Sequence, residues 1–299
     1  MTSSNDATAS RAVPYHARGS LGGRTILMSG GSRGIGLAIA TRAARDGANI
    51  VLMAKTGEPH PKLRGTVFTA AEQLEAAGGQ ALPIVGDVRN DDDVAAAVAA
   101  AVERFGGIDV VVNNASAIDL SRTEQLDMKR YDLMQDINVR GTFLLSKLSL
   151  PALRKSGNAH ILTLSPPLNL DPQWAGRHLA YTMAKYGMSL TTLGLAEELK
   201  DDDVAVNSLW PCTLIDTAAI RNLPGGEQIV QGARSPEIMA DAAHAILTGA
   251  SLAADREGAG SNTGNFYTDE QVLKAAGVKD FSPYSLGAPE GKLVPDIFL

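Results

Sequence analysis

The chain has 299 residues and a formal net charge of −6 at pH 7, from 27 basic and 33 acidic side chains. This mild acidity argues against nucleic acid or an anionic membrane surface as the main partner, because both attract a basic face. The single cysteine, Cys212, excludes an intrachain disulfide and a multi-cysteine zinc site, and no stretch approaches the roughly 18 apolar residues of a membrane span, so we expect a cytoplasmic protein without a metal.

From Arg24 onward, short apolar runs rich in β-branched residues alternate with longer alanine-rich stretches of helical periodicity. This alternation is typical of repeated strand–helix–strand units around a parallel sheet. Strands are predicted at residues 25–29, 49–53, 81–85, 109–113, 160–164, 204–209 and 265–268. Helices are predicted at residues 35–46, 67–77, 91–105, 129–155, 178–200 and 236–249. The pattern predicts an α/β fold with a doubly wound, seven-stranded parallel sheet and helices on both faces.

Residues 1–20 are rich in Ser, Ala and Thr without a continuous apolar run, and we expect them to form a flexible N-terminal segment before a single domain at 21–299. Two irregular regions, 166–177 and 210–235, directly follow strands, where parallel sheets place their ligand crevices. They are the predicted substrate loops, and Trp174 in the first suits either an apolar pocket wall or ordinary loop packing. The tail from residue 279 is expected to pack onto the body or onto a neighbouring subunit.

Residues 29–36 read Ser-Gly-Gly-Ser-Arg-Gly-Ile-Gly and join the first predicted strand to the first predicted helix. Gly30 permits the turn, Gly34 lets the backbone approach a pyrophosphate, and Gly36 lets the helix pack closely on the strand. Glycine clusters also occur in ordinary strand–helix turns, but the place after the first strand favours Rossmann-type dinucleotide binding. The candidate cofactor contacts in this turn are Gly30, Ser32, Arg33, Gly34, Ile35 and Gly36.

Tyr181 and Lys185 stand four positions apart in a helical pattern, so they project from one face of the same helix. An ammonium beside a phenol favours the phenolate, which would let Tyr181 transfer a proton near neutral pH. Such a pair is also a common contact on a helix surface. Ser165 shifts the balance toward catalysis, because it ends the preceding strand, where its hydroxyl can reach the same crevice.

These features belong to a longer series of motifs, which comprises the GxxxGxG turn, Asp87-Val88-Arg89, Asn113-Asn114-Ala115-Ser116, Asn138, Ser165 and Tyr181-Thr182-Met183-Ala184-Lys185. The order and strand positions of this series resemble the short-chain dehydrogenase/reductase family from about Arg24 to Asp269. Closer similarity to its hydroxysteroid-dehydrogenase-like branch comes from Ser165-Pro166-Pro167-Leu168-Asn169-Leu170, Ala180-Tyr181-Thr182, Lys185-Tyr186-Gly187-Met188, and Lys55-Thr56 followed by His60-Pro61-Lys62. Some members of that branch also carry a sterol-carrier domain, which we do not expect in this chain.

The resemblance implies four catalytic roles. Tyr181 is the general acid/base, and Lys185 lowers the pKa of that tyrosine and holds the nicotinamide ribose hydroxyls. Ser165 orients and polarises the substrate carbonyl, and Asn138 supports a water that relays protons to Lys185. These roles agree with the hydrogen-bonding capacity of each residue type.

The resemblance also implies contacts with the adenosine half of the cofactor. It places Asp87 and Val88 at the adenine, and Asn114 and Ala115 along the adenosine. Paired asparagines after a strand can instead brace a turn, so a structural role for Asn113 and Asn114 stays open.

Three departures from the family pattern affect the expected site. The gap of sixteen residues between Ser165 and Tyr181 is longer than usual, which puts in question the angle at which the serine reaches the site. Pro211-Cys212 stands where the family has Pro-Gly, and Thr217 lies one residue later than the usual phosphate-contacting threonine. We expect Cys212 to be a buried neutral thiol rather than a nucleophile.

Cofactor preference depends on the residues after the second predicted strand. Enzymes that use NAD usually place an acid there to accept hydrogen bonds from the ribose 2′-hydroxyl, whereas a 2′-phosphate needs cations. Here the strand runs into Lys55 without an acid, and Arg33 in the glycine turn supplies a second cation. The sequence therefore predicts a preference for NADP(H) over NAD(H). In the competing interpretation, Lys55 points into solvent and Arg33 pairs with a carboxylate, and both cofactors are usable.

The predicted function is reversible hydride transfer between NADP(H), or NAD(H), and an alcohol or carbonyl substrate, which the branch resemblance suggests is lipid-like. The alternatives are a non-catalytic dinucleotide-binding regulator and an enzyme that uses bound NAD(H) internally for epimerisation or dehydration. We expect a small-molecule substrate and a homodimer or homotetramer, formed through the apolar faces of the helices at 129–155 and 178–200.

Overall fold

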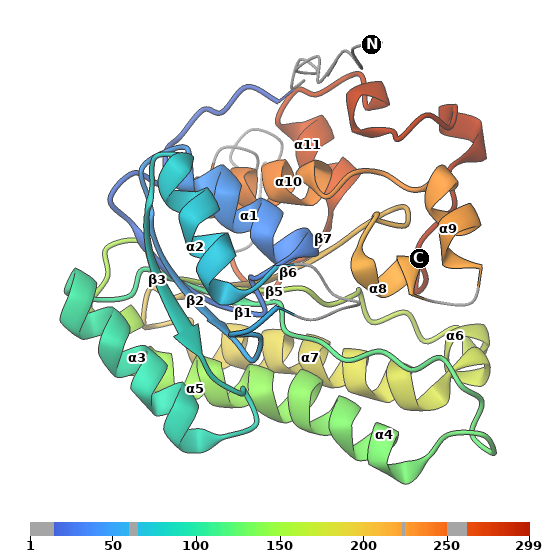
Figure 1. Cartoon of the computed structure of the whole chain (residues 1–299), viewed down its shortest axis with the longest axis horizontal. Helices are drawn as coiled ribbons and strands as arrows, with labels where there is room; N and C mark the ends of the chain where they lie inside the picture. Colours follow the sequence, from blue (N-terminus) through green and yellow to red (C-terminus); the bar gives the residue numbers. More distant parts are fainter. Residues whose placement is uncertain (1–14, 60–64, 223–224, 250–261) are drawn as a thin grey trace, which may run out of the picture.

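The computed structural model describes residues 15–59, 65–222, 225–249 and 262–299. Seven parallel strands form one sheet in the order β3-β2-β1-β4-β5-β6-β7 (Figure 1). The strands are β1 Thr25–Ser29, β2 Asn49–Ala54, β3 Gln80–Val85, β4 Val110–Asn113, β5 His160–Thr163, β6 Ala205–Trp210 and β7 Phe266–Thr268. All seven predicted strands are confirmed, and so is the Rossmann-like, doubly wound sheet.

Apolar side chains on both faces of each strand explain this architecture. Successive side chains along a strand point to opposite faces of the sheet. In β1, Ile26 and Met28 belong to one buried hydrophobic cluster, and Leu27 between them belongs to another. A sheet that is apolar on both faces has to be covered by helices on both, which is why the strands read as continuous hydrophobic runs.

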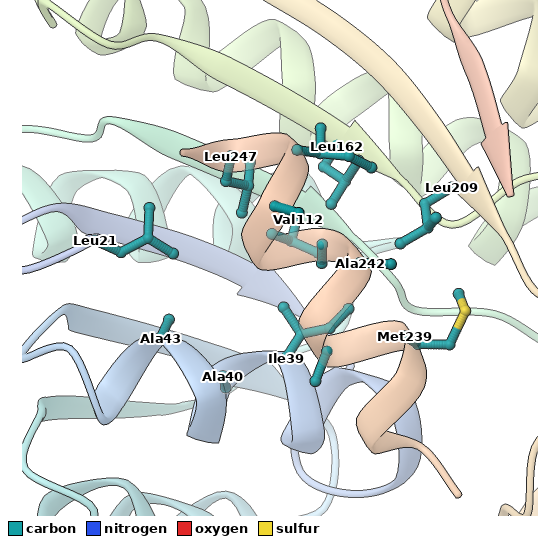
Figure 2. Close-up of a cluster of buried hydrophobic side chains, with 14 of the residues drawn as sticks. Leu21, Ile39, Ala40, Ala43, Val112, Leu162, Leu209, Met239, Ala242 and Leu247 are labelled. Atoms are coloured by element: carbon teal, nitrogen blue, oxygen red, sulfur yellow. The ribbon is translucent and has the colours of Figure 1, made fainter. Parts of the chain in front are cut away.

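Two layers of helices bury these faces (Figure 1). The first layer consists of α1 Gly34–Ala44, α2 Val67–Ala76, α10 Glu237–Leu247 and α11 Asp269–Ala275. The second consists of α3 Asp91–Phe105, α4 Met128–Met134, α5 Gly141–Leu153 and α7 Leu179–Glu198. In Figure 2, Ile39 of α1 and Leu247 of α10 lie in the same cluster as Val112 and Leu162 of the sheet. Complete burial of each such side chain stabilises the fold by about 1.5–3 kcal/mol. Among the described residues, no helix is long and apolar enough to span a membrane.

The predicted helix at 129–155 is confirmed as a helical segment from Met128 to Leu153, but it is not a single α-helix. The chain instead forms α4, then a π-helix at Gln135–Arg140, and then α5. A π-helix adds one residue to a turn inside an otherwise continuous helix, and the helical pattern of the sequence did not distinguish it from α-helix. Such segments are frequent at functional sites, and this one carries Asn138.

The predicted loops contain short helices that their irregular sequences concealed. Region 166–177 includes α6 Pro172–Arg177, and region 210–235 includes α8 Ala218–Arg221 and α9 Gly226–Ile229. The tail from residue 279 forms two single 3₁₀ turns and packs back onto the body of the same chain, as its backbone hydrogen bonds to Gly232 and Cys212 show. The contacts come from segments far apart in sequence, so local patterning gave no signal for them.

Residues 15–21 run along the α1/α10 layer, whereas residues 1–14 of the expected flexible segment lie outside the described residues. The Tyr15 hydroxyl lies 3.0 Å from Nδ1 of His244, and Nε2 of that histidine lies 2.7 Å from Oδ2 of Asp46. The same carboxylate accepts hydrogen bonds from the Leu21 backbone at 2.8 Å and from Arg42 at 2.9 Å. Asp46 therefore fastens the start of the described chain to two helices.

The Asp46→Asn substitution is expected to lower the free energy of unfolding by about 2 kcal/mol at neutral pH. Burial alone would raise the pKa of Asp46, but the hydrogen bonds from Leu21, Arg42 and His244 lower it from 3.8 to about 2. A carboxylate with a lowered pKa stabilises the fold above its unfolded pKa and loses that effect as the pH falls toward the folded pKa. Urea unfolding should show the difference between wild type and variant shrinking from pH 4 toward pH 2. A difference that is constant over this range would contradict the assignment.

Candidate active site

A cavity of about 830 Å³ opens at the carboxyl ends of the central strands. It extends from the glycine turn at the start of α1 to Tyr181 and Lys185 on α7. The predicted site residues that line it are Gly30, Ser32, Arg33, Gly34, Ile35, Lys55, Asp87, Val88, Asn114, Ala115, Tyr181, Lys185, Pro211 and Thr217. The remaining three, Gly36, Ser165 and Asn138, do not.

The glycine turn has the geometry of a phosphate cradle. Gly30 and Gly34 have φ values of +72° and +57°, a left-handed conformation that favours glycine. A Cβ on Gly30 would lie 2.8 Å from Cα of Ala115, and one on Gly36 would lie 2.5 Å from Nδ2 of Asn114. Helix α1 begins at Gly34 without a side-chain cap, so its first N–H groups are free to bind an anion at this end of the cavity.

Asn113 and Asn114 both form hydrogen bonds inside the protein. Asn114 donates from Nδ2 to the Gly30 carbonyl at 2.8 Å and to the Ser29 carbonyl at 3.2 Å, which fixes the glycine turn. Asn113 is buried and donates to Ser146 at 2.9 Å. Asn114 therefore both supports the turn and contributes to the cavity wall, whereas Asn113 is structural.

Two cations lie at the end of the cavity next to β2. Arg33 donates to the Thr56 hydroxyl at 2.9 Å and to the Gly65 carbonyl at 3.1 Å. It forms no ion pair with any carboxylate of the described ranges, contrary to the competing interpretation of its sequence position. Lys55 is half-exposed, and its Nζ lies 4.0 Å from Oδ2 of Asp87, whose carboxylate is bound by Arg89. The side chain of Arg89 holds the pKa of Asp87 below its usual value.

Lys185 is buried at the other end of the cavity. Its Nζ donates to the Leu164 carbonyl at 2.8 Å and lies 5.1 Å from the centre of the Trp210 ring. Burial lowers the pKa of Lys185 to about 7, although the carboxylate of Asp296 opposes this shift. The ammonium is thus held by one carbonyl in a desolvated environment.

Tyr181, one helical turn away, is also buried, and burial raises the pKa of its phenol, with a further contribution from Asp296. The sequence pattern favoured the opposite shift, because it placed a cation beside the phenol without accounting for the loss of water around both groups. At neutral pH the phenol is protonated. It can therefore donate a proton to a bound oxygen.

Ser165 does not reach the cavity. Its side chain is fully buried, and its Oγ lies 2.8 Å from Oγ of Ser208, which in turn donates to Thr192 at 2.8 Å. This chain of hydroxyls links β5, β6 and α7 inside the protein. The expected contact between the serine and a substrate carbonyl is absent from this geometry.

Asn138 is fully buried in the π-helix, outside the cavity wall. Its Oδ1 accepts a hydrogen bond from the Ala117 backbone at 2.7 Å, and its Nδ2 donates to the carbonyl of the same residue at 3.1 Å. This reciprocal pair fixes the segment that follows β4. Asn138 supports the cavity through the backbone instead of lining it.

The surroundings of Trp174 and Cys212 indicate structural roles for both residues. Trp174 lies outside the cavity wall, with its ring 6.0 Å from that of Phe298, so ordinary loop packing describes it. Cys212 is half-buried, and burial raises the pKa of its thiol to about 11, which agrees with a neutral group.

The sequence did not predict the part of the wall that comes from residues 294–297. Asp296 and Ile297 from this segment line the cavity together with Trp210 and Leu214. Nothing in the local sequence points to such a contact, because the segment is irregular and lies far along the chain from Lys185. The cavity therefore combines an anion-binding turn, a buried tyrosine–lysine pair and a wall from the C-terminal segment.

Comparisons with known proteins agree with this geometry. A family model described as short chain dehydrogenase matches residues 24–227. Hydroxysteroid dehydrogenase-like protein 2 of Xenopus laevis is 54% identical to this chain over 281 residues, and the match covers 94% of this chain and 64% of that protein. The Homo sapiens protein of the same name is 52% identical, with the same coverage of both chains. The crystal structure of a short chain dehydrogenase from Mycobacterium thermoresistibile has a TM-score of 0.85 and 53% identity, and the match covers 94% of this chain and 96% of that one. The chain thus spans less than two thirds of the length of these two curated relatives.

Proposed function

The chain belongs to the short-chain dehydrogenase family, and we propose that it catalyses reversible hydride transfer between NADP(H) and an alcohol or carbonyl substrate. One observation carries this assignment. A single cavity joins the glycine turn of α1 to the buried pair Tyr181 and Lys185. A dinucleotide held by its phosphates at the turn would lie in the same cavity as that pair, where a proton transfer has to accompany hydride transfer.

The residues present suit a dinucleotide. The uncapped N–H groups of α1 would bind the pyrophosphate, and the absence of side chains at Gly30 and Gly34 leaves room for it. Lys185 would hold the ribose hydroxyls near the reacting end. When bound, the cofactor supplies or accepts the hydride.

Tyr181 transfers the proton. In the reducing direction its phenol, protonated at neutral pH because burial raises its pKa, donates to the substrate oxygen. Lys185 follows Tyr181 by four residues, so it lies on the same face of α7 as the phenol, and the Leu164 carbonyl fixes its ammonium. Its positive charge favours the phenolate that remains after the proton leaves.

The substrate we propose is apolar and lipid-like. The substrate end of the wall includes the large apolar side chains of Trp210, Leu214, Ile215 and Ile297. Apolar walls with a few convergent polar groups are typical of sites for hydrophobic small molecules. The hydroxysteroid dehydrogenase-like name of the relatives agrees with this class but identifies no compound.

A second candidate is a dinucleotide-binding regulator without turnover. Two observations favour it: the Ser165 hydroxyl is bonded away from the cavity, and burial disfavours the phenolate of Tyr181. A regulator binds NADPH but oxidises none of it with any carbonyl compound. A panel of straight-chain aldehydes and ketones, followed through nicotinamide absorbance, separates the two functions.

We also propose a cytoplasmic location. The single cysteine gives no intrachain disulfide to maintain, and the pKa of that thiol, Cys212, is raised by burial. A chain that uses no intrachain disulfide suits a reducing compartment.

Tyr181→Phe is expected to reduce turnover by about 10²- to 10⁴-fold, because it deletes the transferable proton and keeps the ring. The Kd for NADPH, measured by fluorescence titration, should stay within about threefold of wild type, since the hydroxyl is not needed for cofactor packing. Tyr131→Phe, on α4, is the matched control and should retain full activity. A kcat for Tyr181→Phe equal to that of wild type would remove this tyrosine from the mechanism.

Lys55→Ala and Arg33→Ala should each weaken NADPH binding by about tenfold or more while changing NADH binding little. The two cations form charge-assisted hydrogen bonds with a 2′-phosphate that a hydroxyl cannot replace. Lys200→Ala, on the surface beside Glu197, controls for the loss of a positive charge. Equal Kd values for NADPH and NADH in the wild-type protein, at one ionic strength, would disprove the preference.

We propose that the protein is a homodimer or homotetramer. The solvent side of α5 and α7 carries large exposed apolar side chains, namely Phe143, Leu179, Met183, Leu190 and Leu193. Light scattering at micromolar concentration should report two or four chains, and Leu190→Glu should shift the mass toward the monomer. Leu170→Glu, in an exposed loop outside these helices, should leave it unchanged. A monomeric wild-type protein would contradict the proposal.

A further inference from the structure

We propose that Asp296, in the C-terminal segment, is a substrate-binding residue that donates a hydrogen bond to the carbonyl oxygen beside Tyr181. The proposal rests on the proposed hydride transfer and adds to it the group that polarises the substrate. The sequence assigned the polarising role to Ser165, but the hydroxyl of that serine is bonded to Ser208, away from the cavity.

The segment that carries Asp296 is a fixed part of the cavity wall. Its backbone pairs with the segment that follows β6 through Leu214 N–Val294 O at 2.9 Å, Val294 N–Gly232 O at 2.9 Å and Asp296 N–Cys212 O at 3.1 Å. The indole of Trp210 donates to the Ile297 carbonyl at 2.9 Å. These bonds fix the backbone on both sides of Asp296, so the carboxyl is held at the cavity.

Phe298 anchors the same segment beneath the reacting groups. Its side chain is only 1% exposed, and five rings surround it at centroid distances of 5.3–6.2 Å, those of Trp174, His178, Tyr181, Tyr186 and Trp210. Its φ of +75° is unfavourable for an aromatic residue and persists because this packing holds it. Because Tyr181 and Phe298 pack together, the position of Asp296 is coupled to that of the proton donor.

The carboxyl of Asp296 has hydrogen-bonding capacity left for a ligand. Its Oδ1 accepts a hydrogen bond from the Ile297 backbone at 2.7 Å. Within the described ranges, Oδ2 has no hydrogen-bond partner, and the carboxyl interacts electrostatically with both Lys185 and Tyr181. Ser116 also lines the cavity, but its hydroxyl donates to the Ala117 carbonyl at 3.4 Å. Asp296 is thus the group best placed to meet an oxygen at the tyrosine.

The protonation state of Asp296 suits a donor. Burial raises the pKa of its carboxyl to about 7, with Asp269 adding to the shift and Lys185 opposing it. The other titratable group facing this position is the phenol of Tyr181, whose pKa burial also raises. A protonated carboxyl is therefore populated at neutral pH and can donate from Oδ2.

The reaction balances without consuming the carboxyl. In reduction, the carbonyl carbon gains a hydride as the nicotinamide is oxidised, and the oxygen gains the proton of Tyr181. Asp296 donates a hydrogen bond to that oxygen throughout and neither gains nor loses a proton. This bond strengthens as negative charge builds on the oxygen, so it stabilises the transition state more than the bound ketone.

Three variants test the proposal with the fastest carbonyl substrate of the aldehyde and ketone panel. Asp296→Ala should lower kcat/KM by about 10²-fold, because it removes one donor to the developing oxyanion. Asp296→Asn keeps an N–H donor and should stay within about tenfold of wild type. Ser165→Ala should stay within about threefold, since its hydroxyl is bonded away from the cavity. The Kd for NADPH and the Tm should be unchanged in Asp296→Ala.

The outcomes separate the two proposals. A wild-type protein that oxidises NADPH with no member of the panel refutes the proposed function, and this inference with it. An active wild type with an equally active Asp296→Ala refutes the inference alone. An Asp296→Asn variant as slow as Asp296→Ala also refutes it, because the negative charge beside Lys185 would then matter instead of the donor. A large loss of NADPH affinity in Asp296→Ala would assign the carboxyl to the cofactor and overturn the proposal.

Discussion

The hydrogen bond from the Lys185 ammonium to the Leu164 carbonyl ties α7 to the end of β5, and the reacting end of the site depends on it. Lysine is costly to bury, so it needs a partner to remain charged. The Leu164 carbonyl provides that partner, and its hydrogen bond to the ammonium favours the charged form that burial disfavours. With Lys185 fixed on α7, Tyr181 is fixed one turn away, and the substrate oxygen has a defined place.

Desolvation governs the charges at this end of the cavity. The same loss of water raises the pKa of Tyr181 and Asp296 and lowers that of Lys185, so all three are biased toward their neutral forms. At the opposite end the cations Arg33 and Lys55 and the free N–H groups of α1 face the cavity. One crevice therefore has a positive end suited to phosphates and a nearly neutral end suited to an apolar carbonyl.

The sequence predicted the parts of the molecule that local chemistry determines. Apolar runs such as that of β1 predicted the sheet, because strands buried on both faces must be apolar throughout. Gly30 and Gly34 predicted the turn, because their left-handed backbone suits glycine. The spacing of Tyr181 and Lys185 predicted their shared helix face. In each case the signal lies within a few residues.

The features that the sequence did not predict depend on the orientation of a side chain or on contacts between segments far apart in the chain. The place of Ser165 at a strand end was right, but whether its hydroxyl points into the cavity depends on Ser208, a strand away. The π-helix around Asn138 lies inside a continuous helical segment, and the helical pattern alone did not distinguish it from α-helix. Asp296 reaches the site through backbone pairing with the segment after β6, which no local pattern encodes.

The most direct test of hydride transfer in this cavity uses NADPH with deuterium at both C4 positions and an aldehyde as acceptor. Mass spectrometry should find one deuterium on the carbinol carbon of each alcohol formed, and an alcohol without deuterium, or no alcohol from any carbonyl compound tried, would contradict the assignment.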